Sequence, residues 1–526
     1  MTVQAIPRLA APQATAGTSG TPEARAATVL TRTLERLACS DDAALLTPDR
    51  ALTGREVVAR VRATAGALAD AGAGPGTVVA VLTGPNDPDV VVGRYAARLV
   101  GAGVVHLRSM NPRTDEEAFG VEAQLDVLDR TGAVAVVVDA ASLERATTLR
   151  SHRPLLRVVP VGTDAATDGP AAVTVVPVPT PDAACAVVDV TSGTTGAPRL
   201  VRQSHRSRER LVERLADDLG SAPVHLLSVT PATHTTAPML DAVLLSGGSV
   251  VLHRRFDPGA VLGAVEGGVT DLYLAVPHLC ALLDDPRTAT ADLRSLRRVV
   301  YSGTPAAPHR VAAARRVLGR TVVQVYGTTE TGGISALTPE DHDEPVLHGT
   351  VGRPFPWVDV EVRDPDTGES LPRGHAGAVW VRSGTTADGY WGEDPSALTR
   401  DGWVATGDLG ALEPHGRLRL VGRLAGVIKL GGLKIYPAAI ESALREHPSV
   451  SDAVVHGIRD AERREAVHAV VVPRAGQVVD EDELVAHVTA RLSATHAPTR
   501  VVVWTGVPLT RSGKPDRRLV RELLGG

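Results

Sequence analysis

Residues 191–199 read Thr-Ser-Gly-Thr-Thr-Gly-Ala-Pro-Arg and directly follow the apolar stretch 186–190. Small residues allow backbone N–H groups to approach a phosphate, while hydroxyls and a terminal cation complete the contacts. The Walker A pattern is absent, so the stretch is not a Walker loop. Taken alone, a Ser/Thr/Gly run also fits a flexible turn. The stretch therefore predicts a buried strand that ends in a phosphate-binding loop or in a plain turn.

The sequence on both sides of this stretch alternates apolar runs with helical periodicity. Helical spacing covers 52–71 and 90–100, and strand-like runs lie at 78–82, 104–107, 133–139, 224–229, 250–253, 272–275 and 299–301. Continuous apolar strands that alternate with helices are typical of parallel sheets covered on both faces. The pattern predicts an α/β fold with parallel-rich sheets.

The character of the sequence changes after about residue 350. Short strand-like runs at 358–362, 378–382 and 417–421 are separated by Gly, Pro and Asp turns, which indicates a small β subdomain. Beyond residue 422, helical patterns at 438–446 and 480–492 mix with strand patterns at 453–457, 467–472 and 501–504. We expect a disordered tail (1–27), a large N-terminal domain (28–422), a hinge (423–426) and an α+β C-terminal domain (427–526).

Composition excludes several classes of function. Hydrophobic residues make up 43% of the 526 residues, aromatic residues 3%, and the net charge is −5, so a nucleic-acid partner is not expected. The three cysteines are far apart and form no metal or disulfide pattern. We find no apolar run of 18 residues and no signal peptide, so we expect a cytoplasmic protein with no membrane partner.

Two further motifs carry chemistry. In Gln-Val-Tyr-Gly-Thr-Thr-Glu-Thr-Gly (324–332), an aromatic ring that could stack on a base precedes a carboxylate that could hold Mg²⁺. Tyr326 also fits a core position, and Glu330 also fits a solvated loop. In Gly-Trp-Val-Ala-Thr-Gly-Asp-Leu-Gly (402–410), Asp408 is expected in a tight turn, where its carboxylate could accept from two ribose hydroxyls or only shape the turn.

Together with 422–437 and 509–518, these motifs make the chain resemble the adenylate-forming superfamily from about residue 28 to 523. That superfamily includes acyl- and aryl-CoA synthetases, the adenylation domains of nonribosomal peptide synthesis and firefly luciferase. The resemblance implies ATP-dependent activation of a carboxylic acid to an acyl-adenylate, with Mg²⁺ as cofactor and release of pyrophosphate. The acyl group then passes to the thiol of CoA.

The resemblance also implies roles for individual residues. Nucleotide binding is implied for Thr191, Ser192, Gly193, Thr194, Thr195, Gly196, Arg199, Gly303, Thr304, Pro305, Tyr326, Gly327, Thr328, Thr329, Asp408 and Arg423. Within this set, Asp408 and Arg423 should hold the ribose, and Glu330 and Thr191 the metal. The family usually has Lys where this chain has Arg199, which keeps the charge but alters the contacts.

Only three of the 55 basic residues are lysines, and all three lie in the last hundred residues. By resemblance, Lys514 should bridge the carboxylate and the α-phosphate during adenylation. The C-terminal domain should then rotate about the hinge and bring Lys429 toward the thiol channel. The family often has Asp or Lys at the hinge, whereas this chain has Ala425 followed by Gly426, which keeps the backbone permissive.

The acid is less well indicated. His234 lies where the family builds its acid pocket, near the position at which amino-acid-activating domains place an Asp for the α-amine. Histidine is a poor ammonium partner, so we disfavour α-amino acids, although His234 also fits a loop at the pocket mouth. Three alternatives stay open. The acyl group passes to CoA, it passes to a carrier-protein phosphopantetheine or an amine, or the chain is a silent member that binds nucleotide without catalysis.

Overall fold

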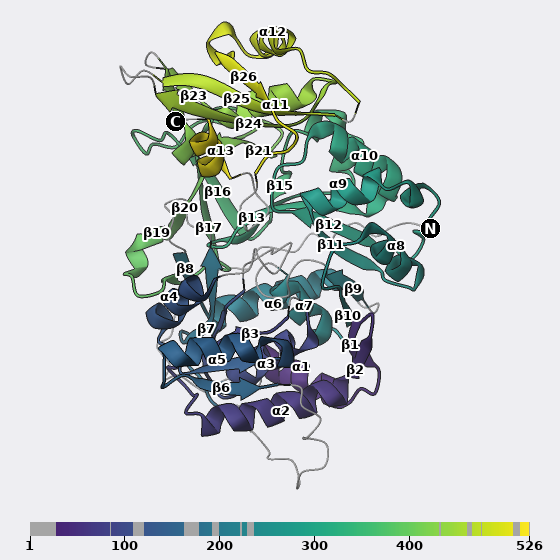
Figure 1. Ribbon diagram of the computed structural model, residues 1–526, viewed down its shortest axis with the longest axis vertical. Coiled ribbons are helices and arrows are strands. Elements are labelled where there is room, and N and C mark those ends of the chain that lie inside the picture. The colour runs from purple at the N-terminus through teal and green to yellow at the C-terminus, as the bar shows by residue number, and fades with distance from the viewer. Residues whose placement is uncertain are drawn as a thin grey trace.

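The computed structural model describes residues 28–84, 86–108, 120–161, 178–191, 199–220, 224–228, 236–430, 433–459, 465–474, 476–508 and 516–524, without the side chains of residues 425, 429, 433, 434, 459 and 465. Two large sheets form the body, and a smaller α+β domain lies at one end (Figure 1). The α/β class and the two-part architecture expected from the sequence are confirmed.

The largest sheet among the described residues has nine strands. In spatial order they are β15 (Arg353–Pro354), β14 (Gly332–Leu337), β13 (Val322–Thr328), β12 (Arg298–Ser302), β11 (Asp271–Ala275), β9 (His225–Ser228), β10 (Ser249–Leu252), β1 (Ala43–Thr47) and β2 (Arg50–Thr53). The strands from β13 to β1 are parallel, and antiparallel strands border them at both edges. The carboxyl ends of neighbouring parallel strands therefore meet at one edge of the sheet.

The second sheet has seven strands in the described part of the chain. Their order is β18 (Gly389–Tyr390), β8 (Arg199–Ser204), β7 (Cys185–Thr191), β4 (Gly103–His106), β3 (Val78–Leu82), β5 (Ala135–Val138) and β6 (Arg157–Pro160). The five strands from β7 to β6 are parallel, while β8 and β18 are antiparallel additions. This sheet carries the two ends of the predicted phosphate loop, Thr191 and Arg199, on paired strands.

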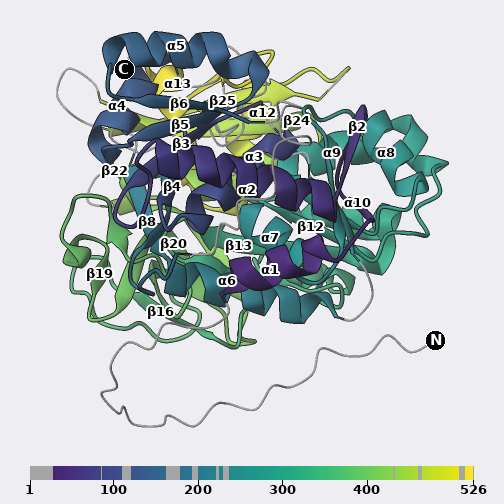
Figure 2. The same ribbon diagram turned by 90° about the horizontal axis from the view of Figure 1, so that it is seen from below.

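Helices cover the sheets and join them. The helices of the N-terminal domain are α1 (Val29–Ala38), α2 (Gly54–Asp70), α3 (Pro88–Leu99), α4 (Val121–Thr131), α5 (Leu143–His152), α6 (His205–Leu219), α7 (Ala237–Leu245), α8 (Pro258–Glu266), α9 (Val276–Asp284) and α10 (Pro308–Leu318). Every residue of α3 is buried because it packs between the two sheets, near α2 (Figure 2). None of the described helices is long and apolar enough to cross a membrane.

A buried cluster of ion pairs and hydrogen bonds links α3 to α6 and α7. Asp241 on α7 accepts from Arg94 over 2.6 Å and from Tyr95 over 2.9 Å, and Arg208 on α6 donates to it over 3.3 Å. All four side chains are essentially inaccessible to water. Removing one partner from such a buried group leaves an uncompensated charge, which is strongly destabilising.

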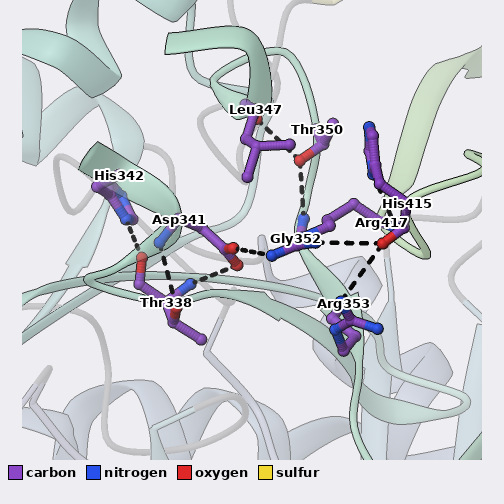
Figure 3. Close-up of polar contacts among 9 residues, drawn as sticks. All are labelled: Thr338, Asp341, His342, Leu347, Thr350, Gly352, Arg353, His415 and Arg417. Atoms are coloured by element: carbon purple, nitrogen blue, oxygen red, sulfur yellow. Dashed lines mark hydrogen bonds and ion pairs between the residues drawn. The ribbon is translucent and has the colours of Figure 1, made fainter. Parts of the chain in front are cut away.

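The β subdomain consists of β16 (Val358–Arg363), β17 (Gly377–Ser383), β19 (Thr399–Arg400), β20 (Trp403–Leu412) and β21 (Leu418–Arg423). Figure 3 shows how it is tied to the nine-stranded sheet. Arg417 donates to Asp341 over 2.6 Å, and Asp341 in turn accepts from the backbone N–H of Thr338, just after β14. The backbone N–H of Gly352 donates to Thr350 beside them.

The C-terminal domain has its own core. It comprises β22 (Ile428–Leu430), β23 (Leu433–Ile435), α11 (Pro437–Glu446), β24 (Val450–Arg459), β25 (Glu465–Pro473), α12 (Glu481–Arg491), β26 (Arg500–Val503) and α13 (Arg517–Leu523). Its main cluster, which includes Ile440 and Leu444 of α11 and Ala469 of β25, contains only residues beyond 427. Of the predicted hinge, 423–426, the first residue ends β21 and residues 424–426 form a single 3₁₀ turn. The domain boundaries themselves stay predictions.

Candidate active site

The site begins at the carboxyl ends of β12 and β13. These strands are parallel, with Tyr301 opposite Gln324. Gly303 and Tyr326 each lie two residues beyond that pair, so the predicted segments 303–305 and 326–329 emerge at the same edge of the sheet. Gly303 has a φ of +98°, which an L side chain rarely adopts. The structure thus brings together two segments that are not adjacent in the sequence.

A carboxylate from the β subdomain reaches this edge. Asp408 accepts a hydrogen bond of 2.6 Å from the Tyr326 hydroxyl and lies 2.9 Å from Nε of Arg423. Arg423 also donates to the backbone oxygen of Thr406 over 3.1 Å. Burial and the charge of Asp408 raise the pKa of Tyr326 well above its ordinary value, so the hydroxyl stays a hydrogen-bond donor at neutral pH. Tyr326, Asp408 and Arg423, three of the predicted nucleotide-binding residues, therefore form one contact cluster.

The position of Asp408 differs from the expectation of a tight turn. Asp408 lies within the long strand β20, opposite Arg423 on β21. The pairing of β20 with β17 is interrupted next to it, and Gly407 there has a φ of +73°. Bulges re-aim a side chain without ending the strand. The Gly-Asp pair that suggested a turn therefore marks a bulge, which directs the carboxylate toward Tyr326.

Thr328 ends β13, and the loop after it carries Thr329 and Glu330. Its shape is set by Gly327, where an added Cβ would lie 2.3 Å from the backbone oxygen of Gly332. Within the loop, the hydroxyls of Thr328 and Thr331 are 3.0 Å apart. The loop is also held from outside, because the backbone oxygen of Glu330 accepts from the Ala387 N–H over 2.8 Å.

A third residue, Tyr390, contacts both the Glu330 carboxylate and Arg199. The Tyr390 hydroxyl donates to Glu330 over 3.4 Å and accepts from Arg199 over 3.2 Å. Sequence reasoning did not identify Tyr390. Its signal was slight: a tyrosine beside Trp391, with a glycine on either side of the pair. The contacts become visible only once the two sheets are assembled.

Several predicted site residues cannot be placed in this geometry. Ser192, Gly193, Thr194, Thr195, Gly196, His234 and Lys514 lie outside the described residues, as does the side chain of Lys429. Thr191 is described, and its hydroxyl donates to the backbone oxygen of Arg199 over 3.4 Å, across the two ends of the predicted loop. The roles of all these residues stay predictions.

The donor set at Glu330 fits Mg²⁺ better than a metal held entirely by protein. Within the described ranges, no group of three or more His, Cys, Asp or Glu side chains could hold a metal ion. Mg²⁺ keeps several waters and binds through one or two carboxylates together with substrate phosphates. Glu330 would supply one such carboxylate.

Comparison with known proteins gives matches over nearly the whole chain. The model of the family described as AMP-binding enzyme matches residues 30–391, and the model described as AMP-binding enzyme C-terminal domain matches residues 439–514. The feruloyl-CoA synthase of an Amycolatopsis species is 34% identical over 90% of this chain and 94% of its own length. A medium/long-chain-fatty-acid–CoA ligase of Mycobacterium tuberculosis is 32% identical over 90% of this chain and 86% of its own.

Solved structures agree with this. The amide bond synthetase McbA from Marinactinospora thermotolerans superimposes with a TM-score of 0.86 at 34% identity, covering 94% of this chain and 99% of its own. ATP-bound MatB from Rhodopseudomonas palustris superimposes with a TM-score of 0.84 at 25% identity, covering 94% and 98%.

Proposed function

The chain belongs to the AMP-binding enzyme family, with CoA ligases among its relatives, and from that premise we propose that it activates a carboxylic acid with ATP and transfers the acyl group to CoA. In the first step a carboxylate oxygen attacks the α-phosphorus and the bond to the β-phosphate breaks. Acyl-adenylate and pyrophosphate result. In the second step the CoA thiol attacks the acyl carbon and AMP leaves.

The observation that carries the proposal is the cluster of Tyr326, Asp408 and Arg423 at the shared strand edge. A buried carboxylate already aimed by a phenol and a guanidinium is suited to accept from the two hydroxyls of a ribose. Residues 303–305 emerge beside it, where an adenine would lie. These contacts support a nucleoside site at this edge of the sheet.

The first step joins an anion to a triphosphate, so its barrier depends on positive charge placed in advance. Arg199, at the start of β8, is suited to contact the phosphates, and Lys514 is proposed to reach the α-phosphate. Glu330 would hold Mg²⁺, which supplies further positive charge against the phosphate oxygens when bound. Loss of one comparable donor elsewhere costs roughly 10²–10³ in rate.

The relatives point to the class of acid. One is a feruloyl-CoA synthase and another acts on medium- and long-chain fatty acids, so we propose an aryl or aliphatic acid without an α-amine. His234 lies in the sequence segment proposed for the acid pocket. Its imidazole is not a partner that would favour an ammonium group.

A second acceptor is favoured by a specific observation. The amide bond synthetase McbA matches 94% of this chain at 34% identity, which is the identity that the feruloyl-CoA synthase shows. The same acyl-adenylate could therefore pass to an amine instead of CoA. Transfer to a carrier-protein phosphopantetheine is the remaining acceptor, and a silent nucleotide-binding member is disfavoured because the described site residues are present and in contact.

Carboxylate-dependent exchange between ATP and pyrophosphate tests the adenylation step. We expect exchange with aryl or aliphatic acids and none with α-amino acids. Acids that support exchange are then incubated with CoA, with a panel of amines or with a phosphopantetheinyl carrier, and the products are identified by mass. Acyl-CoA supports the main proposal, and an amide moves the assignment to the second. ATP binding without exchange for any acid would contradict both.

A further inference from the structure

One segment connects the β subdomain to both large sheets at the site. We call residues 385–391, which follow β17 and include β18, the strap. At its start the Thr385 hydroxyl donates to the backbone oxygen of Thr331 over 3.3 Å, and the Ala387 N–H donates to that of Glu330 over 2.8 Å. The strap therefore holds the Glu330 loop of the nine-stranded sheet.

Its other end belongs to the seven-stranded sheet. β18 pairs with β8, so that Tyr390 lies opposite Val201. The backbone N–H of Trp391 donates to the backbone oxygen of Leu200 over 2.8 Å. Arg199 is two residues from Val201, which makes it a diagonal neighbour of Tyr390 on the same face of the pair. Its guanidinium carbon lies 5.0 Å from the centre of the Tyr390 ring.

An acidic anchor fixes the register of the strap. Asp388 accepts from the backbone N–H of Ser204 over 2.6 Å, and from the hydroxyls of Ser204 and Ser207 over 2.9 and 2.8 Å. Hydrogen bonds to a carboxylate are stronger than those between neutral groups. Ser204 also caps α6, so the anchor joins the strap to the end of β8 and the start of that helix.

The Tyr390 hydroxyl accordingly connects a cation of one sheet to an anion of the other. It accepts from Arg199 over 3.2 Å and donates to Glu330 over 3.4 Å. A phenol is neutral at physiological pH. A neutral group between two opposite charges holds both without letting them close into a direct ion pair.

We propose that Tyr390 is a positioning residue that keeps the Arg199 guanidinium and the Glu330 carboxylate apart and correctly oriented for the phosphates and the metal of MgATP. This inference rests on the proposed function. It also accounts for arginine at position 199, because a planar guanidinium can lie over a ring and donate to its hydroxyl, whereas an ammonium is a point charge.

The test compares three purified variants with the wild-type chain. Tyr390→Phe keeps the ring but removes both hydrogen bonds, and Tyr390→Leu also removes the ring. Trp391→Phe keeps Tyr390 and an aromatic ring at 391 but removes the indole donor that reaches the Arg130 backbone oxygen. MgATP affinity is measured by calorimetry at several Mg²⁺ concentrations, and KM and kcat by exchange. Thermal unfolding checks that each variant is folded.

We expect Tyr390→Phe to weaken MgATP binding and raise its KM roughly tenfold, because Arg199 and Glu330 must first separate, while kcat stays within about threefold. The Mg²⁺ concentration for half-maximal binding should rise in parallel. Tyr390→Leu should show a larger change, since the cation–π contact is lost as well. Trp391→Phe should match the wild type.

Four results distinguish a failure of this inference from a failure of the proposed function. MgATP binding by Tyr390→Phe within twofold of the wild type overturns the inference alone, as does an equal loss in Trp391→Phe, which would make the effect one of strap stability. If the wild-type chain binds MgATP but supports exchange with no acid, the proposed function is overturned. The MgATP affinities of the wild type and Tyr390→Phe still decide the inference in that case. A wild-type chain that does not bind MgATP overturns both.

Discussion

At the scale of single residues, the phenol of Tyr326 is the most informative group, because its hydroxyl orients Asp408 over 2.6 Å. Tyr326→Phe should raise the KM for ATP roughly tenfold with little change in kcat, since a hydrogen bond to a charged group contributes about 1.5–3 kcal/mol and Arg423 retains part of the orientation. Steady-state exchange kinetics measure this.

The control is the same change on the neighbouring strand. Tyr301→Phe removes a buried hydroxyl that lies 2.9 Å from Nε2 of His342, outside the proposed site. It should lower the stability but leave the KM for ATP within twofold of the wild type. Equal values of KM for Tyr326→Phe and the wild type would show that Tyr326 does not orient Asp408 for ATP.

A second single residue predicts a pH dependence of stability. His456 on β24 is 3% exposed and lies opposite His468 on β25, with Arg517 and Arg521 of α13 and Glu441 of α11 nearby. Burial, followed by the charges of His468 and the two arginines, lowers the pKa of His456 from 6.5 to about 4. The folded chain thus holds this imidazole neutral where the unfolded chain protonates it.

The sign follows from the lowered pKa. The stabilising contribution is complete above pH 6.5 and is lost as the pH falls toward 4, by about 2 kcal/mol at pH 5. Urea unfolding at pH 7 and pH 5 should therefore show a smaller difference for His456→Leu than for the wild type, by about that amount. The variant also carries the other histidines, so the comparison isolates position 456, and equal differences would contradict the lowered pKa.

At the scale of elements, connections between β14, β15 and β21 depend on one glycine. Gly352 has a φ of +78°, and a Cβ there would lie 1.9 Å from the backbone oxygen of Ala336. Gly352→Ala should lower the free energy of unfolding by about 3 kcal/mol, because the backbone and Ala336 must both move. Chemical denaturation measures the loss.

Gly349 provides a matched comparison three residues earlier. A Cβ there meets nothing within 4 Å, so Gly349→Ala should leave the stability unchanged or raise it by up to about 1 kcal/mol. If both variants lose a similar amount of stability, the loss does not come from the contact between the added Cβ and Ala336.

Elements also show where sequence reasoning succeeds and where it stops. Buried strands such as β3 and β12 were located to within a residue or two, since a run of apolar residues is a local signal. Helix α2 begins at Gly54, two residues later than expected, because residues 50–53 pair with β1. Tyr390 was missed because its partners Arg199 and Glu330 come from other segments of the chain, and only tertiary structure brings them together.

At the scale of the whole molecule, the C-terminal domain has a separate core, which is consistent with the proposed rotation between half-reactions. Lys514→Ala should reduce adenylation by at least roughly 10²-fold while leaving transfer from preformed acyl-adenylate largely intact. Lys429→Ala should do the reverse. The two half-reactions are measured separately, by exchange and by single-turnover transfer.

Arg518→Ala is the control for charge removal near Lys514. Its side chain is exposed and pairs with Glu522 on the same helix, so both half-reactions should stay near the wild-type rates. Adenylation by Lys514→Ala at the wild-type rate would show that the assignment of that lysine is wrong. Loss of both half-reactions in Lys429→Ala would contradict the rotation.

The order of strands in the nine-stranded sheet has a consequence for synthesis on the ribosome. Leu45 on β1 pairs with Val250 on β10, so β1 has no parallel partner until about 200 further residues have been made. At about 5–20 residues per second, that takes roughly 10–40 s. Throughout this interval the β10-facing edge of β1 has no strand partner on the nascent chain, and an unpaired edge is what a chaperone would have to protect.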